Sequence, residues 1–172
     1  MEHVIPPSVL KNTFCISDLH RRADILQTFL EHFFFGTTPK TGSRAELIVS
    51  FYAQGDPETV QHAHAVAAWG DAVLDLYTEK NVYERIKLLK SLAASLPKLT
   101  LYIPVHFALS QIERIGEWCR AQVQPDILLD IKIDPEAVGG CAFVYKNTFH
   151  DFSFSYFADK QRAAILSLVQ KL

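Results

Sequence analysis

The sequence predicts an α+β protein, in which an all-α helix bundle precedes a small mixed domain. From residue 11 to residue 96, apolar residues recur at the three- and four-residue spacing of amphipathic helices. At Lys98 this period changes to the two-residue alternation of strands. The chain has 172 residues, enough for one ordinary domain or two small ones. We therefore expect a helix bundle over 1–97 and an α/β domain with a hairpin over 98–172.

The composition is that of a globular protein, with 49% hydrophobic and 21% charged residues. No apolar run approaches the roughly 18 residues of a membrane-spanning helix, and the first residues lack the pattern of a secretory signal. We expect a cytoplasmic chain that meets a membrane only through a partner. The net charge of −2 and the lack of a basic block disfavour nucleic-acid binding. The three cysteines lie far apart and indicate free thiols in a reducing compartment.

Helices account for the whole first domain in this prediction. Residues 1–10 are expected to be an extended leader, because Pro6 and Pro7 resist helix and strand alike. Ser17 and Asp18 are expected to cap the first helix, which Gly36 stops after Phe35. Loops of two to seven residues would place successive helices side by side and antiparallel. The other helices are expected over 43–53, over 57–79 with Gly70 as a kink or close contact, and over 82–95.

The second domain is expected to have the order β-α-β-β-β-α. A two-residue connection at Lys146 and Asn147 predicts a tight hairpin, since Asn tolerates positive φ. This register would place Phe143 opposite His150. The expected elements are a strand over 99–105, a helix capped by Ser110 over 110–123, strands over 127–133, 141–145 and 148–154, and a last helix over 157–172.

The candidates for chemistry are weak. His62 and His64 are two residues apart on a helix, so they point away from each other and cannot share a metal. Cys141 and His150 would share a hairpin face as diagonal neighbours about 7–8 Å apart. Asp151 would lie on the opposite face, where it cannot orient the imidazole. We expect no catalytic residues, no cofactor and no metal, and keep a thiol enzyme as an alternative.

A double glycine stands before the hairpin. Gly139 and Gly140 precede a strand, whereas a phosphate-binding loop precedes a helix and uses its first amides. We therefore interpret Asp134, Pro135, Gly139 and Gly140 as a structural turn, in which glycine supplies positive φ or lets another backbone approach.

The aromatic run that follows allows two interpretations. It either packs the hairpin inside its own domain, or leaves one face as an apolar surface for a partner, such as an amphipathic helix. The possible partner surface consists of Val144, Phe149, Phe152, Phe154 and Phe157.

Residues 99–157 resemble the C-terminal domain of the delta subunit of F-type ATP synthases, the oligomycin-sensitivity-conferring protein family. The resemblance lies in the order and spacing of three motifs. They are Ala108-Leu109-Ser110 at a helix start, Ile133-Asp134-Pro135-Glu136-Ala137-Val138-Gly139-Gly140, and Asp151-Phe152-Ser153. The chain resembles a divergent member, because 1–97 carries no family pattern and Phe154 stands where a basic residue usually follows Asp-x-Ser.

The resemblance implies a structural, non-catalytic stator in the peripheral stalk of a rotary ATP synthase. The helical half would hold N-terminal helices of the alpha subunits, and the second half the C-terminal helices of the b-type stalk subunit. The subunit would resist rotor torque during proton-driven ATP synthesis. Its place would be peripheral, at the cytoplasmic face of the inner (cell) membrane within the complex.

Two further classes remain as alternatives. One is the stator-like protein of a flagellar or type III secretion ATPase, although the long coiled coil typical of such proteins is not apparent in 1–97. The other is a cytoplasmic helix-binding adaptor.

Overall fold

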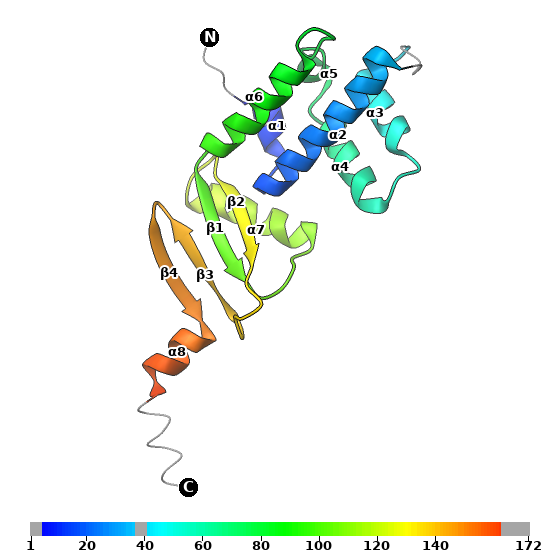
Figure 1. The fold of residues 1–172 in the computed structure, drawn as a ribbon. Helices are drawn as coiled ribbons and strands as arrows, with labels where there is room; N and C mark the ends of the chain where they lie inside the picture. The colour runs from blue at the N-terminus through cyan, green and yellow to red at the C-terminus, as the bar shows by residue number, and fades with distance from the viewer. Residues whose placement is uncertain (1–4, 37–40, 163–172) are drawn as a thin grey trace.

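The computed structural model describes residues 5–36 and 41–162 and has the α+β fold that the sequence predicts: helices first, then a small four-stranded sheet (Figure 1). The described elements are α1 (Pro7–Lys11), α2 (Ile16–Phe35), α3 (Arg44–Tyr52), α4 (Pro57–Ala67), α5 (Asp71–Leu74), α6 (Val82–Ser95), β1 (Lys98–Ile103), α7 (Leu109–Gln122), β2 (Leu128–Ile133), β3 (Gly140–Tyr145), β4 (Thr148–Ser153) and α8 (Phe154–Lys160).

The long helix α2 is the centre of the helical half. Its apolar stripe is fully buried at Leu19, Leu26, Phe29 and Leu30, because α4 and α6 pack against it. Burying each such side chain contributes about 1.5–3 kcal/mol. This stripe supplies the largest part of the helical half's core, since short helices have little stability of their own in water.

The start of the chain differs from the prediction. Residues 7–11 form α1 rather than an extended leader, because Pro7 occupies the first helical turn, where its missing N–H costs nothing. The cap predicted at Ser17 and Asp18 is also wrong. Cys15 holds the N-cap position of α2 with extended backbone, and the Ser17 hydroxyl lies 3.0 Å from the Cys15 sulfur instead.

The single helix predicted over 57–79 is wrong as well. The chain leaves α4 after Ala67, and Gly70 adopts a φ of 84°, which no residue within a right-handed helix has. The break allows Trp69 to be buried in the core. Asp56 caps α4 as expected, since its carboxylate accepts a hydrogen bond from Thr59 N. Helix α6 has the predicted bounds.

The sheet has the strand order β2-β1-β3-β4, with β2 parallel to β1 and the other pairs antiparallel. The predicted hairpin turn is confirmed, because Lys146 and Asn147 have φ values of 47° and 61°, as a type I′ turn requires. The predicted register, Phe143 opposite His150, is also confirmed. Helix α7 packs on one face of the sheet and leaves the other open (Figure 1).

Several boundaries in the second half differ from the prediction; β1, for example, ends at Ile103 and not at residue 105. Helix α7 starts at Leu109, so Ser110 is not its cap; the Gln111 side chain accepts a hydrogen bond from Ala108 N in its place. Helix α8 starts at Phe154, earlier than predicted. The remainder of the predicted last helix, 163–172, lies outside the described residues. Among the helices of 5–36 and 41–162, none combines the length and the hydropathy that crossing a membrane requires.

Candidate partner-binding surface

The Asp-Pro/Gly-Gly segment is a turn that carries the chain past the end of β1, from β2 to β3. The Asp134 backbone N–H bonds to Ile103 O at 2.8 Å, which holds the segment against the end of β1. The Asp134 carboxylate accepts a hydrogen bond from Glu136 N at 3.1 Å, and Ala137 N donates to Asp134 O at 3.2 Å. These bonds close a compact turn after Pro135. The segment thereby sets where the hairpin begins.

Gly140 is required by its backbone conformation, and Gly139 lies close against Phe154. Gly140 has a φ of 80°, and a Cβ there would overlap the carbonyl oxygen of Phe152. A Cβ on Gly139 would lie 2.6 Å from the Phe154 ring. Phe154 N also donates to Gly139 O at 3.0 Å. The pair therefore lets the end of β4 and the start of α8 lie directly against the turn.

The Asp-x-Ser motif ends β4 and starts α8. The Asp151 carboxylate accepts a hydrogen bond from Ser153 N at 2.8 Å. Hydrogen bonds from the Ser153 side chain, and then from its backbone, lower the pKa of Asp151. The Ser153 hydroxyl in turn accepts a bond from Tyr156 N at 3.2 Å, which caps α8. The motif thus fixes the direction in which α8 leaves the sheet.

Four phenylalanines predicted as a partner surface are largely exposed. The exposed fractions are 59% for Phe149, 49% for Phe152, 64% for Phe154 and 46% for Phe157. The fifth residue, Val144, is half-buried. Isolated exposed apolar residues are ordinary, but several large ones next to each other indicate an interaction surface.

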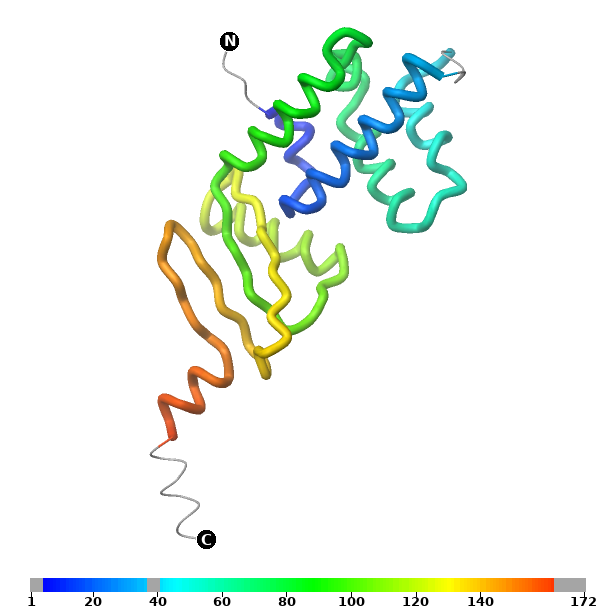
Figure 2. Tube along the Cα trace, viewed as in Figure 1, coloured from blue at the N-terminus to red at the C-terminus, as the bar shows by residue number. Residues whose placement is uncertain are grey.

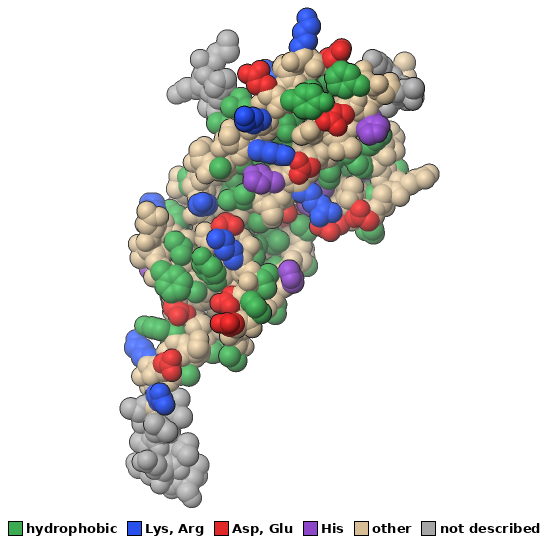
Figure 3. Space-filling model, in the orientation of Figure 1, with side chains coloured by type: hydrophobic (Ala, Val, Ile, Leu, Met, Phe, Trp, Pro, Cys, Tyr) green, Lys and Arg blue, Asp and Glu red, His purple; other side chains and the backbone are tan. Residues whose placement is uncertain are grey.

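The five residues do not lie on a single face of the sheet. Val144 and Phe149 pair on the face that α7 leaves open, where hydrophobic side chains gather over the strands (Figure 3). Phe152 lies on the α7 face and stacks on Phe143 at a ring distance of 5.8 Å. Phe149, Phe152 and Phe157 border one hollow along β4, the edge strand of the sheet in the described residues, whereas Val144 and Phe154 do not.

We call this region the β4–α8 surface. It is an open hollow of about 600 Å³ that runs along β4 to α8. Helix α8 lies at the end of the sheet farthest from the helix bundle (Figure 1). Helix α8 contributes no buried residue, so its aromatic side chains remain available. The lining residues are Phe149, His150, Asp151, Phe152, Tyr156, Phe157 and Lys160.

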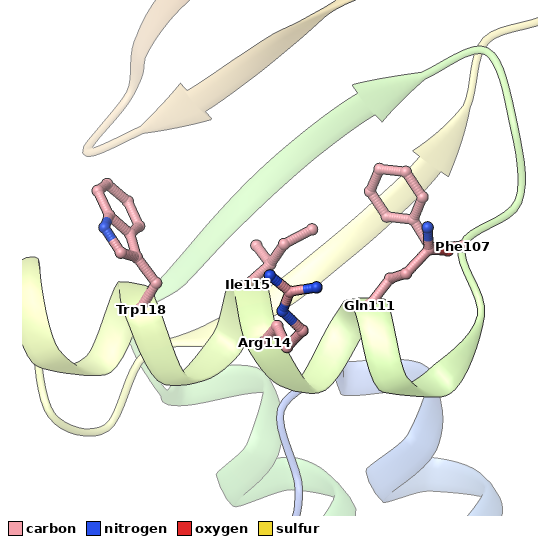
Figure 4. Close-up of a pocket in the computed structure, with 5 residues that line it drawn as sticks. All are labelled: Phe107, Gln111, Arg114, Ile115 and Trp118. Carbon is pink, nitrogen blue, oxygen red and sulfur yellow. The ribbon is translucent and has the colours of Figure 1, made fainter.

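A second apolar hollow, of about 450 Å³, lies along α7. Phe107, Ile115 and Trp118 project to the same side of the helix axis, with Gln111 and Arg114 between them (Figure 4). Trp118 is 62% exposed. This groove was not predicted from the sequence. The feature of the sequence that could have indicated it is the position of Trp118, three residues after Ile115. This spacing places a large aromatic side chain beside the buried stripe of the helix.

Phe143 connects the two regions. Its side chain packs against the apolar cluster beneath α7, and its ring stacks on both Phe152 and His150, the latter at 4.8 Å. Phe143 therefore lies between the groove along α7 and the β4–α8 surface, and the strip from one to the other is suited to a long apolar partner.

The proposed thiol chemistry finds little support in the geometry. Asp151 pairs with Ala142, on the opposite face from His150, as the sequence indicated. Cys141 pairs with Phe152 and is half-buried. His62 is buried between helices while His64 is exposed, so the two histidines diverge. Over 5–36 and 41–162, no group of three or more His, Cys, Asp or Glu side chains is arranged to hold a metal ion.

In comparisons with known proteins, neither a family model nor a curated protein matches the chain.

Proposed function

We propose that this chain is a structural stator subunit of a rotary F-type ATP synthase, of the delta type. In this proposal, the helical half binds N-terminal helices of the alpha subunits. The sheet half binds C-terminal helices of the b-type stalk subunit at the cytoplasmic face of the membrane. The chain contributes mechanical resistance to torque and performs no catalytic step.

The observation that carries the proposal is the exposed aromatic strip over α7, β4 and α8. An amphipathic helix buries its apolar stripe against such a surface, with aromatic side chains as the main anchors. Phe152, Phe157 and Trp118 are large and 46–62% exposed. Helix α7 lies beside the helix bundle, whereas α8 leaves the sheet at the opposite end (Figure 1). That position suits a stalk that reaches away from the catalytic head.

Two of the three resembling motifs give further support, because each has a mechanical role in this surface. Asp134 and Gly140 form the turn that places the hairpin. Asp151 and Ser153 set the direction of α8. Asp134, Asp151 and Ser153 also line a hollow of about 460 Å³ that Cys141 borders. In this proposal, their spacing is accounted for by their hydrogen bonds to backbone amides, which set the shape of the surface.

The helical half offers a smaller apolar surface of its own. Phe35 and Phe51 are exposed near the end of α2, where Phe51 packs edge-on against Phe29 at 5.8 Å. In the proposal, this half holds the alpha-subunit helices.

Calorimetry tests both contacts. The full chain is titrated with a peptide of the b-type subunit's C-terminal residues and with a peptide of the alpha subunit's N-terminal residues, both from the organism of this chain. We expect heat of binding and a one-to-one or higher stoichiometry for each. A folded chain that binds neither peptide would contradict the proposal.

A further inference from the structure

A short segment between α1 and α2 holds the two halves together. We call Asn12–Cys15 the junction segment. Leu129 N of β2 donates a hydrogen bond to Phe14 O at 2.7 Å, and Cys15 forms a parallel bridge with Leu129. The segment therefore continues the sheet at the edge of β2, although it belongs in sequence to the helical half.

Arg120 of α7 binds this segment from the sheet half. Its guanidinium donates to Leu10 O at 2.7 Å and to Thr13 O. The same group lies 4.4 Å above the Phe14 ring, within the range of a cation–π interaction. Burial lowers the pKa of Arg120 from its usual high value, but an arginine remains charged in a protein. The charged Arg120 guanidinium thus donates hydrogen bonds to two backbone carbonyls of the helical half.

Arg22 of α2 binds the same segment from the helical half. It donates to Asn12 O and, at 2.7 Å, to the Thr13 hydroxyl. That hydroxyl donates to Val9 O of α1 at 2.6 Å. Thr13 is consequently bonded by an arginine from each half, and its side chain is fully buried.

Close packing accompanies these bonds. A Cβ on Gly116 of α7 would lie 2.5 Å from the Phe14 ring, so the ring rests directly on the helix backbone. Leu128 of β2 is buried within the hydrophobic cluster of the helical half. The only direct chain connection between α6 and β1 is Leu96 and Pro97 (Figure 2). A hinge motion at that connection would have to break the junction contacts.

We propose that the junction segment is a clamp that fixes the two halves in one orientation, so that the chain is a rigid arm and not two domains on a hinge. Domains joined by an exposed linker with few crossing contacts normally move relative to each other. Here the crossing contacts are buried or partly buried, include charge-assisted hydrogen bonds, and are made by an arginine from each half. The inference concerns the isolated chain and does not depend on which partners it binds.

Residual dipolar couplings of the full chain test the clamp directly. We expect one alignment tensor to fit the amide couplings of both halves, with equal rotational correlation times. Arg120→Ala and Gly116→Val should each require two tensors and give unequal correlation times. Arg114→Ala, on the exposed side of the same helix, is the matched control and should keep one tensor.

Two results would overturn the proposal. One is that the couplings of the folded wild-type chain fit only with two alignment tensors; this result can be interpreted without any variant. The other is a single tensor in both Arg120→Ala and Gly116→Val, with well-dispersed spectra that show both halves folded.

Discussion

The two halves of the chain bury their aromatic residues differently. In the helical half, Phe29 is fully buried and Trp69 nearly so, within a cluster built from several helices. In the sheet half, Phe149, Phe152 and Phe157 remain 46–59% exposed. Its core beneath α7 is a small cluster built around Leu99, Leu101, Cys119, Ile127 and Leu129.

This difference indicates separate uses for the same residue type. Phenylalanine stabilises the helical half by being removed from water. In the sheet half, the exposed rings contribute less to folding, and in the proposed function they bind a partner. Mutations in the two halves should therefore affect different measurements.

The largest effect is expected from Phe29→Ala. The ring is completely buried on α2, so its removal loses apolar burial and leaves a cavity, at a cost of about 3–5 kcal/mol. Urea unfolding monitored by circular dichroism measures this cost. Phe157→Ala is the matched control in the sheet half and should change the unfolding free energy by less than about 1 kcal/mol. Equal costs would remove the distinction between the halves.

Gly140→Ala should have an intermediate effect. Its φ of 80° strains any other residue, and the new Cβ would overlap Phe152 O. We expect a loss of about 1–3 kcal/mol, with increased amide exchange along β3 and β4. Gly42→Ala also has a positive φ, of 116°, but its Cβ would meet only the Glu46 side chain, at 3.8 Å. It should cost less, and a greater loss for Gly42→Ala would contradict the role of the turn.

The two helix caps should respond on different scales. Asp56→Ala removes the cap of α4, which is packed in the core, and should lower global stability by about 1 kcal/mol. Ser153→Ala removes the cap of α8, which has no buried residue. Its effect should be confined to faster hydrogen exchange within α8. A global destabilisation by Ser153→Ala equal to that of Asp56→Ala would show that α8 belongs to the cooperative core.

The smallest effect concerns pH. Burial, and then the charge of Arg22, lower the pKa of His62, which is 1% exposed. The folded state therefore binds this proton less readily than the unfolded state, whose histidine pKa is about 6.5. The contribution of neutral His62 to the free energy of unfolding is therefore fully present above the unfolded pKa. It is lost as the pH falls through the folded pKa.

Urea midpoints between pH 7.5 and 5.5 measure this dependence. His62→Leu should reduce the decline in stability, because no buried group then has to gain a proton. His64→Leu is the matched control, since His64 is exposed on the same helix. If the urea midpoint of His62→Leu falls with pH as much as that of the wild type, the pH dependence comes from other groups.

Local patterns of sequence predicted much of the fold. The type I′ turn at Lys146 and Asn147 and the bounds of α6 follow from short-range rules, and both agree with the structure. The break at Gly70 was missed, because the apolar spacing continues through it and the burial of Trp69 is a tertiary effect. The helix at Pro7 was missed because proline was weighed as a breaker and not as a first-turn residue.

The surface could be predicted only in part. The sequence indicated that the hairpin has aromatic side chains on both faces, but whether they are exposed depends on where α7 and α8 lie. The groove brings together Phe107, from the loop before α7, and Trp118, from the helix itself. The junction at Arg120 joins residues more than 100 positions apart, a separation at which periodicity carries no information.

The central claim is that the β4–α8 surface binds a helix of a stalk partner. The most direct test is the affinity of the b-type C-terminal peptide for the wild-type chain, for Phe152→Ala/Phe157→Ala, and for Tyr83→Ala, an exposed aromatic of the helical half. We predict at least a tenfold loss of affinity for the double variant, about 1.4 kcal/mol, and no change for Tyr83→Ala. Equal affinity of the double variant and the wild type would contradict the claim.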